Sequence, residues 1–116
     1  MKKELYNIVL VRDKCNKKYY VVNSKDDFEF FENFNFNKDL SFNVIGKILT
    51  VYNDELNMIQ DMLHEIAINN DSITHKKISA IKIWIQYDYN LSHMSDIQKE
   101  ELVRNYTKGY LNNDIM

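Results

Sequence analysis

The chain of 116 residues contains no proline and only two glycines, Gly46 and Gly109. Because proline and glycine punctuate turns and loops, their scarcity predicts long regular elements joined by tight polar turns and argues against a loop-rich scaffold. Cysteine is almost absent as well. The single Cys15 excludes an internal disulfide framework and leads us to expect a protein of the reducing cytoplasm.

Long apolar runs are also missing. No stretch approaches the roughly 20 residues that a membrane-spanning helix needs. The basic residues near the N-terminus are not followed by an apolar segment of signal-peptide length. We therefore expect no membrane partner.

The third absence is any grouping of side chains suited to catalysis or metal binding. Cys15 lies in a polar stretch, where nothing nearby in sequence builds the dry site that a nucleophile needs. His64, His75 and His93 lack a metal-ligand spacing, and two isolated glycines cannot form a phosphate-binding loop. Neighbouring carboxylates fall at predicted helix starts, where the helix dipole explains most of them. We expect a protein without enzymatic activity, cofactor or metal.

The residues that are present are typical of one folded domain. Hydrophobic residues make up 45% of the chain and charged residues 28%, an ordinary balance for a globular protein of this length. The net charge of −2 hides an asymmetry, because residues 1–20 carry six basic and two acidic side chains. Abundant Asn, Lys, Ile and Tyr indicate codons rich in A and T, which suggests a low-GC bacterium or one of its phages or plasmids.

Three segments near the N-terminus read as strands. Leu5–Val11 and Tyr19–Val22 are rich in apolar, β-branched and aromatic residues and flank a polar turn, so they predict an antiparallel hairpin. Residues Ser41–Tyr52 predict a third strand. Gly46, in the middle of that strand, predicts a bulge or a close approach of another backbone.

Three segments read as helices. Ser24 is a candidate N-cap for a short helix over Lys25–Phe34. Asn53 and Asp54 are candidate caps of a helix that runs to about Asn69, whose apolar side chains recur at helical spacing. Ser95 and Gln98 have the spacing of a capping box, which predicts a last helix from Asp96 to about Leu111.

The alternation of apolar and polar residues over Ala80–Tyr89 predicts a fourth strand, since period two with isoleucines and tyrosines fits a half-buried pleated surface. The expected fold is α+β, in the order β-β-α-β-α-β-α, with a mostly antiparallel sheet of three or four strands and helices on one face. The alternative is a helix over residues 73–90, which would leave a sheet of three strands.

Aromatic residues are the best candidates for a binding surface. Trp84 occupies the polar side of the predicted strand, and Tyr87 and Tyr89 follow it. Because aromatic side chains anchor many protein interfaces, we expect a non-enzymatic protein that binds another protein through these three residues. An accessory or inhibitor protein of a phage or plasmid would fit this interpretation. Homodimerisation through an unpaired sheet edge stays open.

The alternative is a small regulator that binds DNA or RNA. Basic residues crowd the predicted hairpin tip, and two tyrosines follow them. Such side chains can neutralise phosphates and stack on bases. The candidate residues are Arg12, Lys14, Lys17, Lys18, Tyr19 and Tyr20. The acidic character of the whole chain, with a pI of about 5.9, argues against this reading.

Overall fold

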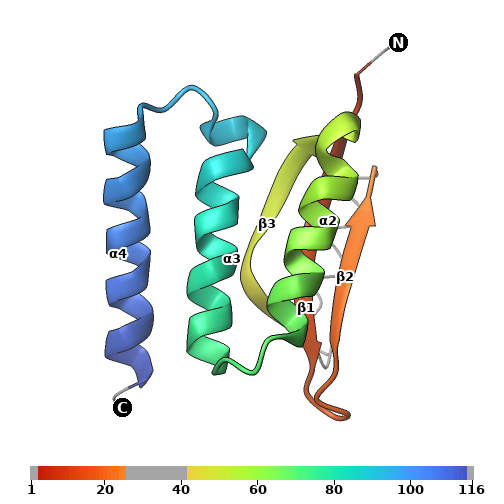
Figure 1. Cartoon of the computed structure of the whole chain (residues 1–116), viewed down its shortest axis with the longest axis vertical. Helices are drawn as coiled ribbons and strands as arrows, with labels where there is room; N and C mark the ends of the chain where they lie inside the picture. Colours follow the sequence, from red (N-terminus) through yellow and green to blue (C-terminus); the bar gives the residue numbers. More distant parts are fainter. Residues whose placement is uncertain (1–2, 26–41, 115–116) are drawn as a thin grey trace.

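The computed structural model describes residues 3–25 and 42–114. Within these ranges, three strands precede three α-helices and a short 3₁₀ helix (Figure 1). In chain order the elements are β1 (Leu5–Asp13), β2 (Tyr19–Ser24), β3 (Phe42–Tyr52), α2 (Asn53–Ile68), α3 (Ile73–Tyr87), η2 (Tyr89–Leu91) and α4 (Asp96–Asp114). The α+β class is confirmed, but the predicted alternating order is wrong.

The sheet is antiparallel, with the strand order β2-β1-β3. Val9 of β1 pairs with Val22 of β2, and Leu10 of β1 pairs with Ile45 of β3. The predicted hairpin and third strand are therefore confirmed. The hairpin turn is tied together by Asp13, whose side chain accepts a hydrogen bond of 2.8 Å from the backbone N–H of Cys15.

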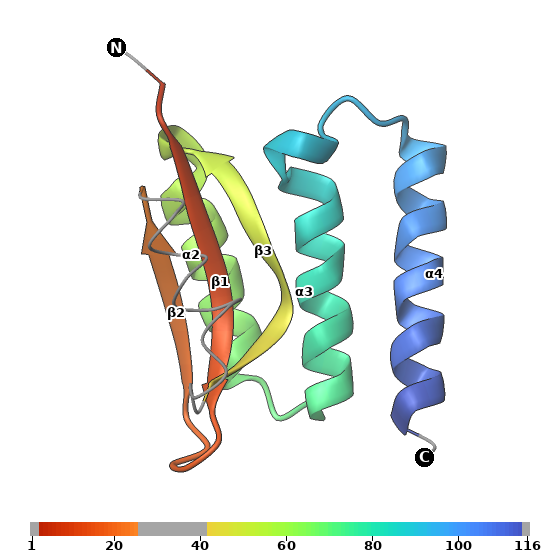
Figure 2. The ribbon, with the colours of Figure 1, turned by 180° about the vertical axis from the view of Figure 1, so that it is seen from behind.

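The main core lies between one face of the sheet and two helices. Apolar side chains of β1 and β3 meet those of α2 and α3 there, and they are almost completely shielded from water. Figure 2 shows β1 and β2 in front of α2, with α3 beside β3. The buried members of this cluster are Ile8, Leu10, Ile45, Leu49, Val51, Ile59, Leu63, Ile66, Ala80 and Ile83. A smaller cluster around Val9 and Val11 lies on the other face.

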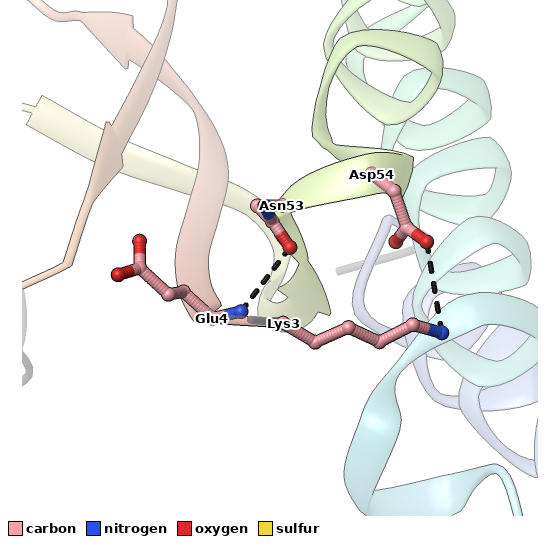
Figure 3. A network of polar contacts seen from close by, with 4 residues as sticks. All are labelled: Lys3, Glu4, Asn53 and Asp54. Carbon is pink, nitrogen blue, oxygen red and sulfur yellow. Dashed lines mark hydrogen bonds and ion pairs between the residues drawn. The ribbon is translucent and has the colours of Figure 1, made fainter. Parts of the chain in front are cut away.

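The start of α2 is anchored to β1 through Asn53. The Asn53 side-chain oxygen accepts a hydrogen bond of 3.1 Å from the Glu4 backbone N–H (Figure 3), and the Asn53 N–H donates to the Glu4 carbonyl at 2.8 Å. Lys3 adds an exposed ion pair of 3.6 Å with Asp54. The helix prediction is confirmed, but the predicted capping role of Asn53 is wrong, because its side chain bonds to the backbone of Glu4, just before β1, and not to its own helix.

The predicted strand over Ala80–Tyr89 is wrong. Residues Ile73–Tyr87 form α3, with Ser72 as N-cap, and a 3₁₀ turn follows at Tyr89–Leu91. A helix without a clear polar face is stable when other elements cover it. The helix α3 has β3 on one side and α4 on the other (Figure 1), so Ile81, Ile83 and Ile85 are buried although they point in several directions. The alternative prediction, with a helix in this region and a sheet of three strands, is the better one.

The last helix, α4, begins as predicted. The Ser95 hydroxyl accepts a hydrogen bond of 3.2 Å from the Gln98 N–H, and the Gln98 side chain accepts one of 2.9 Å from the Ser95 N–H. This reciprocal capping box satisfies two backbone donors at the helix start. The helix packs on α3 and forms an outer layer away from β1 and β2 (Figure 1). The predicted helix over Lys25–Phe34 lies, except for its first residue, outside the described residues.

Candidate functional site

A groove with a volume of about 640 Å³ runs between α3 and α4. Its apolar lining comes from Ile78 on α3 and from Val103 and Leu111 on α4. The two helices are antiparallel, so Leu111 lies toward the end of α4 that is near the start of α3 (Figure 1). Leu111 leaves 48% of its surface exposed. The groove is therefore an apolar surface that is open to solvent.

Charged side chains surround this apolar lining. Lys82, Arg104 and Lys108 supply three positive charges, and Glu100 supplies one negative charge. All four side chains are exposed. The local excess of positive charge is opposite in sign to the net charge of −2 of the whole chain. The arrangement can bind a ligand that combines an apolar surface with negative charge.

Trp84, a predicted partner-binding residue, makes its main contacts within the chain. Its ring meets that of Tyr106 on α4 edge to face, with ring centroids 5.4 Å apart. The ammonium group of Lys47 on β3 lies 5.8 Å from the Trp84 ring and 5.3 Å from the Tyr106 ring. These three side chains connect β3, α3 and α4, and they hold α4 in place.

The other two predicted aromatic residues have different environments. Tyr87 is half-buried and packs against the main core. Tyr89 is 42% exposed, and its ring lies 5.2 Å from that of Tyr52 in an edge-to-face contact. Of the three predicted aromatic residues, only Tyr89 presents a large exposed surface.

The predicted basic residues do gather at the hairpin tip. Lys14, Lys17 and Lys18 are exposed, while the guanidinium group of Arg12 lies 6.0 Å from the ring centroid of Tyr19. Tyr20 is 40% exposed. The turn that carries these charges places Lys17 at a φ of 61°, a left-handed conformation that is uncommon outside glycine.

A buried lysine was not anticipated from the sequence. Lys76 of α3 is only 5% exposed, and its ammonium group donates hydrogen bonds to the carbonyls of Ile66 at 2.9 Å and Ala67 at 3.1 Å, and to that of Asn69. These carbonyls belong to the C-terminal end of α2, where a positive charge is favourable. The same ammonium lies 5.1 Å from the Tyr19 ring. Lys76 therefore joins α2, α3 and β2 and has a structural role.

Titratable residues do not form a metal site in the described part of the chain. His64, His75 and His93 are all exposed, as is the free thiol of Cys15. Among residues 3–25 and 42–114, no three His, Cys, Asp or Glu side chains come close enough together to hold a metal ion. No helix in these ranges combines the length and the apolar character needed to cross a membrane.

Comparison with known proteins gives no family for this chain. No protein family, no curated protein and no solved structure matches it significantly. The sequence did contain a signal for the α3–α4 groove: if Ile73–Tyr87 is read as a helix, Ile78 and Lys82 fall on one face at i and i+4.

Proposed function

We propose that the protein is a non-enzymatic binding protein whose α3–α4 groove takes an acidic amphipathic helix of another protein. The observation that supports this proposal is the open apolar groove bordered by an excess of positive charge. An amphipathic helix laid in such a groove buries its apolar stripe against Ile78, Val103 and Leu111. Its flanking carboxylates pair with the surrounding cations, which favours acidic partners over basic ones.

A role as an accessory or inhibitor protein of a phage or plasmid is compatible with this mode of binding. Occupation of one helix-binding groove is enough to block or recruit a partner, and it requires no catalytic group on this chain. Most of the affinity is expected from a few buried contacts at the centre of the groove. Val103 is the central candidate for such a contact, because it is apolar, half-buried and lies in the middle of α4.

Site-specific photocrosslinking tests the proposal. A photoreactive amino acid is placed at Val103, and at exposed Asn23 on β2 as a control position. The tagged protein is then incubated with nuclease-treated lysate of a low-GC bacterium. We expect a protein crosslink from position 103 that is absent from position 23, and its mapped peptide should be acidic with an apolar stripe at helical spacing.

A charge variant distinguishes specific from adventitious crosslinks. Arg104→Glu reverses one charge beside the groove and leaves the apolar lining intact. This variant should lose the crosslink from position 103. Equal crosslinking from both positions, an R104E variant that crosslinks as well as the wild type, or a mapped peptide that is basic would each contradict the proposal.

The second candidate function is nucleic-acid binding by the hairpin tip, and it is supported by the conformation of Lys17. A lysine at a φ of 61° costs about 1–2 kcal/mol that a glycine would not. A positive charge at such a strained position suggests that the charge itself is useful. Together with Arg12, Lys14 and Lys18 it could contact phosphates, while exposed Tyr20 stacks on a base.

The Lys17→Gly variant tests the backbone strain and the positive charge of Lys17 separately, the first by stability and the second by nucleic-acid binding. It relieves the backbone strain, so we expect the free energy of unfolding to rise by about 1 kcal/mol. It also removes one phosphate contact, so binding to single-stranded and duplex DNA should weaken and the salt dependence should become shallower by about one charge. The same titration is made with single-stranded RNA. Binding to DNA and RNA that is undetectable in the wild type at low salt, or unchanged in K17G, would exclude this second function.

A further inference from the structure

A second cavity lies between β3 and the C-terminal end of α3, apart from the α3–α4 groove. Its volume is about 460 Å³, within the range of about 300–1,000 Å³ that is usual for small-molecule sites. Val44 and Ile48 of β3 and Trp84 of α3 form its apolar lining. Asn7 and Asp88 are the polar residues of its lining that are almost completely buried, each with 2% of its surface exposed.

Asp88 is the chemically distinctive group of this cavity. One carboxylate oxygen accepts a hydrogen bond of 2.8 Å from the Thr50 N–H, and the other accepts one of 2.7 Å from the Asn90 N–H. The Asn90 side chain also hydrogen-bonds to this carboxylate. Because each oxygen of a carboxylate can accept two hydrogen bonds, the group retains capacity for a further donor. These two backbone bonds also hold the carboxylate in a fixed orientation at the cavity.

The negative charge of Asp88 has no ion-pair partner within residues 3–25 and 42–114. Buried carboxylates are rarely found without a cation beside them. The helix dipole increases the imbalance, because Asp88 caps the negative C-terminal end of α3, and the last turn of this helix contains no basic residue. The cavity is thus electrostatically suited to receive a positive charge.

Lys47 is the cation of the lining, but it does not neutralise Asp88. Its ammonium group lies beside the rings of Trp84 and Tyr106, at 5.8 Å and 5.3 Å from their centroids, and forms no ion pair with Asp88 within 4.0 Å. The Trp84 ring is itself a favourable neighbour for a positively charged group. A bound cation could therefore use both the Asp88 carboxylate and the Trp84 ring.

We propose that this cavity binds a small organic cation, with an amine or guanidinium group that donates hydrogen bonds to Asp88 and an apolar part that lies against Trp84, Val44 and Ile48. The site is separate from the proposed protein-binding groove, and occupation of one does not require the other. A neutral or anionic molecule of the same shape should bind much less well, because it leaves the buried carboxylate without a cation.

Trp84 makes the proposal directly measurable, since it is the only tryptophan of the chain. The full-length ¹⁵N-labelled protein is titrated with phenethylamine, with its neutral counterpart 2-phenylethanol and with the anion 3-phenylpropionate, and the indole N–H resonance of Trp84 is followed. We expect phenethylamine to shift this resonance together with the Thr50 and Asn90 amides, with an affinity at least tenfold above that of 2-phenylethanol. Equal affinities for the amine and the alcohol, or no shift with the amine, would overturn the proposal.

Three variants connect this binding to the named residues. Asp88→Asn removes the charge and should abolish the preference for the amine, while Lys47→Met removes the cation of the lining and should strengthen amine binding several-fold. Because an amide can accept from only one of the two backbone N–H groups, D88N could also unfold. In that case Ile48→Trp tests the site, since it leaves Asp88 unchanged, fills the cavity with a larger side chain and should eliminate amine binding. Amine binding that survives in I48W, or a preference for the amine over the alcohol that survives in folded D88N, would refute the site.

Discussion

Gly46 of β3 lies so close to Ala80 of α3 that a Cβ added to Gly46 would stand 2.6 Å from the Cβ of Ala80. The strand pairing is irregular at the same place, between Ile8 and Leu10 of β1, and Gly46 has a φ of +86°. The glycine thus serves both a bulge and a close helix approach. Because α3 packs on β3, this contact sets the position of α3 and therefore of the groove and of the Asp88 cavity.

The first prediction concerns that contact. Gly46→Ala should lower the free energy of unfolding by about 2–4 kcal/mol, because a left-handed backbone conformation and an overpacked neighbour both oppose the added methyl group. Gly109→Ala is the matched control. A Cβ there meets nothing within 4 Å, and alanine favours the helix by about 1 kcal/mol, so the protein should become more stable. Urea unfolding measures both variants, and a neutral G46A would contradict the assigned contact.

The second prediction concerns the buried ammonium of Lys76. Lys76→Met keeps an unbranched side chain, one atom shorter than that of lysine, but leaves the carbonyls of Ile66, Ala67 and Asn69 without their donor. We expect a loss of about 2–3 kcal/mol, the usual cost of buried polar groups left without a partner. Lys82→Met on the same helix is the control, because Lys82 is exposed and should change stability by less than about 0.5 kcal/mol. Equal effects of the two substitutions would exclude the capping role.

The strands and α4 could be predicted because their signals are local. Short runs of apolar, β-branched and aromatic residues identify β1, β2 and β3, and the pair Ser95 and Gln98 specifies the start of α4. The secondary structure of Ala80–Tyr87 is not determined by local sequence. Its isoleucines happen to recur at every second position, which is the pattern of a strand. A helix without a polar face is stable here only because β3 and α4 cover it on either side. That information lies in the tertiary contacts.

The candidate sites also divide into those that local sequence identifies and those that tertiary contacts create. The basic residues at the hairpin tip could be identified because they are close in sequence. The sequence shows only one wall of the α3–α4 groove, Ile78 and Lys82, and only if Ile73–Tyr87 is read as a helix. The groove as a whole could not be identified, since Ile78 and Val103 meet only when the two helices pack antiparallel. The environment of Asp88 is also tertiary. Its hydrogen-bond partner Thr50 lies 38 positions away in the chain, and no residue near Asp88 in sequence predicts this bond.

The third prediction concerns pH. Burial raises the pKa of Asp88 above its ordinary value of 3.8, and it outweighs the hydrogen bonds from Thr50 and Asn90, which lower the pKa. Between the pKa of the unfolded chain and the higher pKa of the native state, the native protein binds more protons. The stability contributed by this group is therefore complete below pH 3.8 and is lost as the pH rises through the native pKa.

Urea unfolding of the wild type and D88N at a series of pH values checks this sign. The free energy of unfolding of the wild type, relative to that of D88N, should decrease as the pH rises through this window. Titration of the Asp88 carboxyl by ¹³C NMR should independently give a value above 3.8. A difference between the two proteins that increases with pH would show that the backbone hydrogen bonds outweigh burial.

The fourth prediction concerns the attachment of α4. None of its side chains from Asp96 to Leu111 is fully buried, so the helix is attached through half-buried side chains alone. The pair Trp84 and Tyr106 is central among them, and an edge-to-face aromatic pair contributes about 0.5–1.5 kcal/mol beyond the area that it buries. A double-mutant cycle with Trp84→Ala and Tyr106→Ala should give a coupling energy in this range. Trp84→Ala alone should cost more than Tyr106→Ala, because Trp84 also packs against the main core.

Hydrogen exchange locates the effect of these substitutions. In Y106A, the amides of α4 should exchange faster while those of β1 and β3 keep their protection, because a weakly attached outer helix opens before the core. The groove needs both of its helices, so Y106A should also lose the crosslink from position 103. Arg104→Glu should lose the crosslink while exchange in α4 stays unchanged. If Y106A instead accelerated exchange throughout the sheet, α4 would be an integral part of the folding unit rather than a separable layer that completes a binding groove.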